Sequence, residues 1–157
     1  MKFACTVENL TEATSIASRF VQRNPSMPML GCVYMETNGD SVVIRATNLE
    51  CGVEVVFPAR VTAQGAVAIS STTLMGFLSN NKGHQIDVDV EGGVMKIKSE
   101  RSSATIKTTP HDDFPILPRI GAEQVFTAKA ADLARAIRSV INCAAVSNIK
   151  PELQSVL

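Results

Sequence analysis

The clearest alternation of apolar and polar positions lies in the stretch between residues 28 and 58. Three apolar-rich runs occupy residues 30–35, 42–46 and 53–57. An Asn-Gly-Asp turn at 38–40 separates the first two runs, and Asn-Gly between apolar runs is the strongest short-range hairpin signal. A Thr-Asn-Leu-Glu connector at 47–50 joins the last two runs. The pattern predicts a three-stranded antiparallel meander.

A strand and a helix are predicted before this meander. Residues 2–8 form the strand, and residues 9–23 form the helix, with Asn9 as N-cap and Glu12 in a capping-box position. The helix carries an apolar stripe at helical spacing, made of Leu10, Ala13, Ala17, Phe20 and Val21. The first unit therefore runs strand, helix, three strands.

The same order then recurs. In the second unit a strand at 65–70 leads into a helix at 71–80, capped by Ser71, whose apolar side is Leu74, Phe77 and Leu78. Strands at 85–90, 94–99 and 104–108 follow, and residues 109–118 form a Pro-rich linker. A third unit begins with a strand at 123–129, a helix at 132–146 and the start of a strand at 153–157. The stripe of this third helix is Leu133, Ile137, Val140 and Ile141.

A repeat of roughly 60 residues indicates stacked supersecondary units that share continuous sheets. It predicts an α+β fold in which helices 9–23 and 71–80 lie side by side on one face and antiparallel sheets cover the other. We expect one complete domain over residues 1–120 and a truncated second domain over residues 121–157. The truncated part lacks the sheet on which its helix would pack, so we expect it to pack on a neighbouring molecule or to be poorly ordered.

Composition limits the function classes. The chain has 157 residues, of which 45% are hydrophobic, so it can bury a core. Lys plus Arg equals Asp plus Glu, 15 each, which argues against nucleic-acid binding by bulk charge but not against a local basic face. Aromatic residues make up 4% of the chain, so stacking on single strands is not expected as the main activity.

The four cysteines, Cys5, Cys32, Cys51 and Cys143, are widely spaced and contain no Cys-x-x-Cys pair. This spacing does not suggest a zinc site. The N-terminal residues form a strand pattern without the apolar core of a signal peptide, and no apolar run reaches the roughly 20 residues of a membrane span. A cytoplasmic protein with reduced thiols and no membrane partner is expected.

We find no catalytic constellation, and expect neither enzyme activity nor a metal or cofactor. Residues 111–113 (His-Asp-Asp) resemble a metal or acid–base cluster, but a polar turn before Phe114-Pro115 explains them better. His84 lies in the turn after the second helix. Ser70-Ser71 precedes a helix without a Gly-x-Ser-x-Gly elbow, and the glycines form no phosphate loop. A small hydrolase is therefore a remote alternative.

The polar faces of the predicted helices are the more informative feature. Arg135, Arg138 and Asn142 share one face of the third helix, with Asp132 in its first turn. Arg19 and Arg23 lie at the end of the first helix. The second offers Thr72, Thr73, Ser79 and Asn80, followed by Lys82. Most acids lie on strands or turns. The faces are either ordinary solvated surfaces or a surface that meets a polyanion, with the sheets turned away from it.

Four motifs resemble the bacterial DNA polymerase III beta subunit family, the sliding clamps. They are Lys2-Phe3 with Asn-Pro-Ser-Met-Pro-Met-Leu-Gly at 24–31, which contains the hairpin entry, Ala-Thr-Asn-Leu-Glu at 46–50, which contains the connector, Asp-Phe-Pro at 113–115, and Lys-Pro-Glu-Leu-Gln-Ser-Val-Leu at 150–157. They are in register along the whole chain and resemble the family's first domain and the start of its middle domain.

The resemblance implies a non-catalytic processivity factor. Members of this family have three such domains per protomer and close as head-to-tail homodimers around duplex DNA, with helices lining the hole. They tether the replicative polymerase and are loaded by a clamp loader, through parts absent from this chain. On this basis the DNA-contacting candidates are Arg19, Arg23, Asn24, Lys82, Arg135, Arg138 and Lys150.

The chain departs from the family in three ways. Asn24 stands where a basic residue is common, so Arg23 would have to substitute for it. The second helix contains no Lys or Arg, and the later domains, with the peptide-binding groove, are missing. The alternative is a protein-interaction module that uses exposed sheet edges and has no DNA role. The two hypotheses differ in where they place the basic residues. A clamp has them on the helix face, and the interaction module has them at sheet edges.

Overall fold

The computed structural model describes residues 1–22, 27–118, 126–145, 153, 155 and 156, which fall into two compact units, Met1–Pro118 and Arg119–Leu157. Each is described here by itself. Unit 1 contains β1 (Lys2–Thr6), α1 (Val7–Ser18), η1 (Pro28–Gly31), β2 (Cys32–Asn38), β3 (Ser41–Thr47), β4 (Gly52–Pro58), β5 (Arg60–Ala63), β6 (Ala66–Ser70), α2 (Ser71–Ser79), β7 (Gln85–Glu91), β8 (Val94–Ser99) and β9 (Ser103–Lys107). Unit 2 contains α3 (Ala130–Val140) and η2 (Ile141–Cys143).

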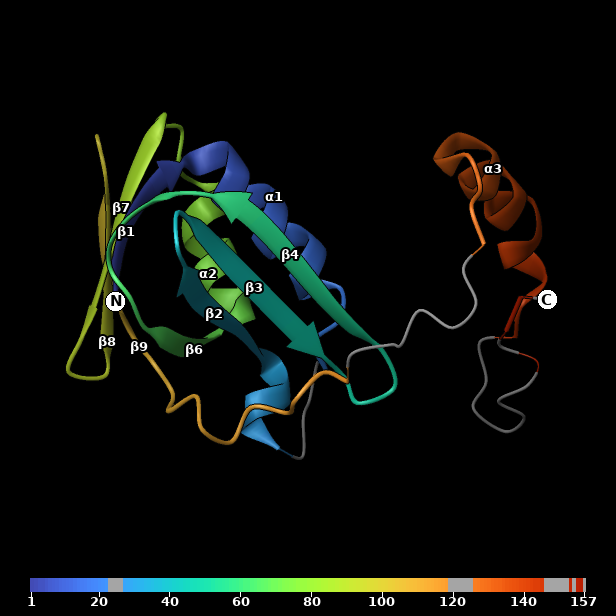
Figure 1. The fold of residues 1–157 in the computed structure, drawn as a ribbon, viewed down its shortest axis with the longest axis horizontal. Coiled ribbons are helices and arrows are strands. Elements are labelled where there is room, and N and C mark those ends of the chain that lie inside the picture. Colours follow the sequence, from blue (N-terminus) through green and yellow to red (C-terminus); the bar gives the residue numbers. More distant parts are fainter. Residues whose placement is uncertain (23–26, 119–125, 146–152, 154, 157) are drawn as a thin grey trace. The chain divides into compact units, whose positions relative to one another are not determined.

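Unit 1 is built from two antiparallel sheets and a pair of helices. Sheet A has the order β5-β1-β7-β8-β9, and sheet B has the order β4-β3-β2-β6. In Figure 1 sheet A is seen edge-on at the left, and α1 and α2 both lie behind sheet B. The two helices pack against each other. The predicted arrangement of helices side by side with sheets on the other side is therefore confirmed.

The leading strand of each predicted unit pairs with the other unit's meander. β1 pairs with β7, from Lys2 opposite Asp89 to Thr6 opposite Gln85. β6 pairs with β2 in the same way, from Cys32 opposite Ser70 to Glu36 opposite Ala66. Each helix thus carries the chain from one sheet to the other, and this exchange makes unit 1 a single core.

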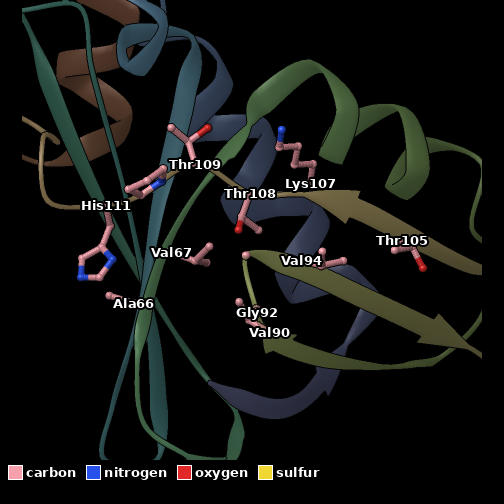
Figure 2. Close-up of a pocket in the computed structure, with 12 residues that line it drawn as sticks. Ala66, Val67, Val90, Gly92, Val94, Thr105, Lys107, Thr108, Thr109 and His111 are labelled. Carbon is pink, nitrogen blue, oxygen red and sulfur yellow. The ribbon is translucent and has the colours of Figure 1, made fainter.

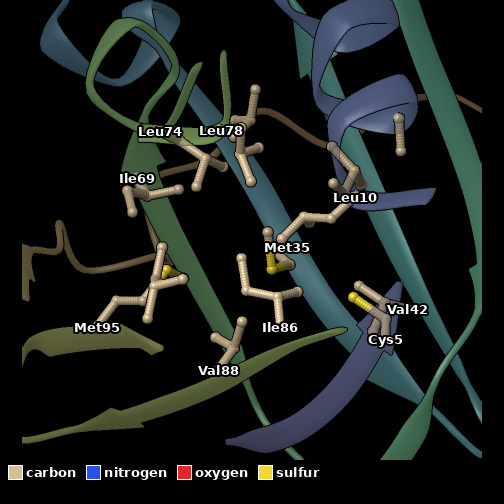
Figure 3. Packing of buried hydrophobic residues seen from close by; sticks show 14 of the residues in the cluster. Cys5, Leu10, Met35, Val42, Ile69, Leu74, Leu78, Ile86, Val88 and Met95 are labelled. Atoms are coloured by element: carbon tan, nitrogen blue, oxygen red, sulfur yellow. The ribbon is translucent and has the colours of Figure 1, made fainter. Parts of the chain in front are cut away.

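That core lies between the two sheets and the helix pair. Figure 3 shows Leu10 of α1 and Leu74 and Leu78 of α2 directed toward Met35 and Ile86 of the two sheets. All five side chains are almost completely inaccessible to solvent. Burying a large aliphatic side chain stabilises a fold by roughly 1.5–3 kcal/mol, so these contacts fix the helices on the sheets.

Both helices have their N-cap earlier than predicted, and α1 also begins earlier. The N-cap of α1 is Thr6, whose hydroxyl accepts from the Asn9 amide at 3.2 Å. The N-cap of α2 is Ser70, which accepts from the Thr73 amide at 3.4 Å. Asn9 and Ser71 were therefore wrong as caps, because the last residue of each preceding strand already has the extended backbone and hydroxyl acceptor that a cap requires.

The predicted end of the first helix was also wrong. α1 ends at Ser18, and the Arg19 and Phe20 amides donate to Ile16 and Ala17, three residues back. Such bonds tighten a final turn and end an α-helix. Phe20 and Val21 still pack on the core, as the stripe predicted.

The meander is confirmed, with local corrections. Gly39 has φ 56° in the first turn, where Asn38 pairs with Ser41. The first run begins as η1, so strand β2 starts at Cys32 rather than at residue 30. The short strand β5, paired with β1, was missed: it has only four residues and begins two residues after the end of β4.

The predicted linker is an ordered strap, residues 109–117, across the outer face of sheet B. The Thr109 amide donates to the Ala68 carbonyl at 2.9 Å. Phe114 packs on a small cluster that includes Cys32 and Ala68, and Leu117 lies so close to Gly52 that a Cβ there would meet it at 2.5 Å. The strap therefore adds a second, small apolar layer outside the main core.

Unit 2 differs from its predicted pattern. α3 has no buried residue, and Leu133 and Ile141 are each 53% exposed. Residues 126–129 and the described residues near the C-terminus are not in strands, and the remainder of both predicted strands lies outside the described residues. The predicted buried stripe is thus exposed, because the described part of unit 2 contains no sheet on which it could pack.

Candidate nucleic-acid interface

The helix pair of unit 1 exposes a polar surface with a shallow groove. One wall is the first half of α1 (Glu8, Thr11, Glu12), and the other is the end of α2 with residues 81–84. The His84 carbonyl accepts from the Val7 amide at 3.0 Å, which ties the loop after α2 to the start of α1. The end of α2 therefore lies beside the beginning of α1, and the helices run antiparallel.

This arrangement separates two of the predicted DNA-contacting residues. Lys82 is exposed and lines the groove at the start of α1. Arg19 is exposed at the other end, where it is the C-cap. A helix of 12 residues is about 18 Å long, so the two cations can contact different phosphates but cannot share one.

The other predicted residues are distributed between the two units. Arg135 and Arg138 lie on α3 and are exposed. Arg23, Asn24 and Lys150 lie outside the described residues. Whether all seven candidates line one surface is therefore a prediction that stays open.

Acidic residues lie on the helix pair of unit 1 as well as on its strands. Glu8 and Glu12 are exposed on α1, in the same groove as Lys82. Apart from Arg19 and Lys82, the described basic residues of unit 1 lie on strands or strand turns: Lys2, Arg45, Arg60, Lys96, Lys98, Arg101 and Lys107. The surface of the helix pair is polar rather than strongly basic, so any phosphate contact that it makes must be weak.

The polar face of α3 also contains an acid that the sequence interpretation had set apart. Asp132 Oδ1 lies 2.6 Å from Arg135 Nη2, three residues along the same face. Asp132 was expected only to favour the helix dipole from the first turn. The structure shows that it also pairs with one of the two arginines, which leaves Arg138 as the unpaired cation of the described part of α3.

A charged hub on sheet B was not predicted. Arg45 donates to Glu54 at 2.6 Å and to Glu36 at 3.1 Å, and its guanidinium lies 5.5 Å from the centre of the Tyr34 ring. The hydrogen bond to Glu54 raises the pKa of Arg45, and burial followed by the Glu36 charge raises the pKa of Tyr34. The signal available was the register that places Tyr34, Arg45 and Glu54 opposite one another on three strands.

Tyr34, which lies beside Arg45 in this hub, also contacts the strap. The Tyr34 ring lies 5.2 Å from that of Phe114 and 6.2 Å from that of His111. The Phe114 amide donates to the His111 carbonyl at 3.0 Å, which closes the predicted polar turn. His111 and the neighbouring Asp112 therefore belong to a turn of the strap, and both side chains are exposed.

A second hollow lies where the two sheets meet (Figure 2), between the start of β6, the β7–β8 turn and the end of β9. Its walls include Val67, Val90 and Val94, and its rim includes Lys107 and His111. β9 is an edge strand of sheet A. This is the part of unit 1 that fits the alternative of a module that binds at sheet edges.

The described residues contain no group of three or more His, Cys, Asp or Glu side chains placed to hold a metal ion. All four cysteines are free thiols, and Cys5 and Cys32 are buried. Burial, with a smaller contribution from the Asp87 charge, raises the pKa of Cys5 to about 12. None of the helices in the described ranges is long and apolar enough to cross a membrane.

Comparison with solved structures defines the class of fold. The beta subunit of DNA polymerase III from Pseudomonas aeruginosa superposes with a TM-score of 0.87 at 24% identity, over 98% of this chain and 42% of that one. Two sheets that enclose a core with a helix pair on one side are thus the DNA-clamp fold.

The family follows from the sequence. The profile of the DNA polymerase III beta subunit, N-terminal domain, matches residues 1–118, and the chain belongs to that family. It is 28% identical to the beta sliding clamp of Synechocystis over 99% of this chain, and 27% identical to that of Micrococcus luteus over 99%. It spans 42% and 50% of the lengths of these two relatives.

Proposed function

We propose that this chain is the part of a DNA sliding clamp that contributes one complete clamp domain, residues 1–120, and the start of the next, residues 121–157. The observation that carries the proposal is the family match over residues 1–118, which coincide with compact unit 1. The clamp would act without catalysis, as a processivity factor that holds a replicative polymerase on duplex DNA.

The weak charge of the helix surface is compatible with this function. A ring retains DNA by enclosing it, and a protein that must slide needs few phosphate contacts, because each contact that releases counterions adds to the affinity and its salt dependence. Arg19, Lys82 and Arg138 are exposed cations that can supply such contacts. Arg23, Asn24, Arg135 and Lys150 complete the proposed set.

The proposed partners are duplex DNA, a second protomer, a replicative polymerase and a clamp loader, in the cytoplasm. The proteins would bind through regions that are absent from this chain. This chain by itself is therefore expected neither to remain on closed circular DNA nor to stimulate a polymerase.

The test is to map the DNA contact on this chain. In an NMR titration with a 30-base-pair duplex at low salt, we expect shift changes around Arg19, Lys82 and α3, similar for duplexes of unrelated sequence. Changes confined to β9, Lys107 and the hollow between the sheets would contradict the proposal and favour a sheet-edge binding module.

A further inference from the structure

Two of the cations proposed to meet DNA have carboxylates beside them. Asp132 Oδ1 lies 2.6 Å from Arg135 Nη2, and the two side chains are 56% and 79% exposed. In unit 1, Glu8 and Glu12 line the same groove as Lys82. DNA that approaches Arg135 therefore meets a cation that is already paired with a carboxylate, and DNA that approaches Lys82 meets two carboxylates in the same groove.

A purely structural role explains Asp132 only in part. A carboxylate in the first turn of a helix favours the macrodipole, and Lys129, the N-cap of α3, makes no side-chain capping bond. That role requires only the negative charge at this position. It does not require a guanidinium at 2.6 Å from the carboxylate. The pairing therefore has a second effect: any other anion that binds Arg135 must compete with Asp132.

We infer that Asp132 competes with DNA phosphate for Arg135 and thereby limits how strongly α3 holds DNA. The inference rests on the proposed function. An exposed ion pair is weak, so phosphate can displace Asp132, and Asp132 can displace phosphate, at little cost. When the DNA moves on, Arg135 returns to its own carboxylate instead of remaining a bare cation, which lowers the barrier between successive phosphates.

The competition predicts a gain of affinity when the acid is neutralised. In Asp132→Asn, Arg135 is free, and binding to a fluorescein-labelled 30-base-pair duplex should tighten by up to about fivefold at 20 mM salt. The slope of log affinity against log salt should steepen by up to about 0.9, the value for one additional phosphate contact. Fluorescence anisotropy of the 157-residue chain from 20 to 200 mM salt measures both quantities, at chain concentrations where hydrogen exchange shows that α3 is protected.

A double-mutant cycle separates competition from bulk charge. In an Arg135→Ala background, Asp132→Asn should leave both affinity and slope unchanged, because no guanidinium remains to be released. Asp132→Glu keeps the charge and should restore the parental values. The double variant Glu8→Gln, Glu12→Gln should also tighten DNA binding, provided that Lys82 is present.

The matched control is Glu100→Gln, the same loss of charge in the β8–β9 turn, where Glu100 is exposed and forms no ion pair in the described part of the chain. An equal gain in this control, or an equal effect of Asp132→Asn without Arg135, would overturn the inference. Unchanged binding in Asp132→Asn would overturn it as well. If neither the parent nor any variant bound the duplex at 20 mM salt, the proposed function itself would fail.

Discussion

Burial of the apolar stripe of α3 on another surface would favour association. Leu133, Ile137, Val140 and Ile141 are 53%, 40%, 43% and 53% exposed. Complete burial of one such side chain is worth roughly 1.5–3 kcal/mol, and about half of that remains to be gained at each. Docking the stripe on an apolar surface should therefore release about 3–6 kcal/mol before entropic costs.

By itself, α3 has little to keep it folded. It is 11 residues long, and isolated helices shorter than about 12–15 residues are marginal in water. We expect amides 133–141 to exchange rapidly in a dilute monomer and to become protected as concentration rises and chains associate. Hydrogen exchange followed by mass spectrometry, with sedimentation to establish the oligomeric state, measures this dependence.

The variant Ile137→Asp should abolish the concentration-dependent protection, because it places a charge within the stripe. Ser139→Asp adds the same charge at an exposed polar position of the same helix and should preserve it. Strong protection of residues 133–141 in a demonstrated monomer would show that the segment finds a core within its own chain, and the reasoning would be refuted.

Four further predictions concern DNA binding, the core and the thiols. In the intact protein, Arg135→Ala with Arg138→Ala should weaken duplex binding equally for all sequences and reduce the salt slope by up to about two units, measured by anisotropy. An unchanged slope would show that neither side chain contacts phosphate. Leu10→Ala, at a position with 0% exposure, should lower the free energy of unfolding by about 2–5 kcal/mol in urea titrations. Cys51 should react quickly with a thiol reagent at pH 8 and Cys5 only on unfolding, since Cys5 is buried with a pKa raised to about 12. Because the thiol of Cys5 ionises near pH 9 when unfolded but has a pKa of about 12 in the fold, the free energy of unfolding should fall progressively as pH rises from 9 toward 12.

The core and thiol predictions have internal controls. Leu49→Ala removes the same atoms as Leu10→Ala from a side chain that is 63% exposed and should have little effect on stability; equal losses at both sites would contradict the assigned core. In a Cys5→Ala variant the loss of stability between pH 9 and 12 should become smaller. Rapid modification of Cys5 in the folded chain would show that the strand carrying it opens readily.

The order of elements in unit 1 was predictable from the sequence because it depends on local patterns. The Asn-Gly turn at residue 39 and the helical stripe through Leu10 and Ala17 each determine the structure of only the neighbouring residues. The caps were missed although their signal was equally local, since Thr6 and Ser70 end strands and were assigned to the strands alone. The family motifs added the clamp fold, which the repeat alone did not distinguish from other α+β arrangements.

Tertiary structure decided which strands became neighbours and where the charges finally lay. That β1 pairs with β7, and β6 with β2, depends on the two helices crossing between sheets, and no local pattern encodes such a crossing. The hub of Arg45 with Glu36 and Glu54 exists only because register places three strands side by side. In contrast, α3 shows what a sequence determines without its tertiary partner. Its periodicity is sufficient to specify an amphipathic helix, but burial of its stripe requires a surface supplied by other residues.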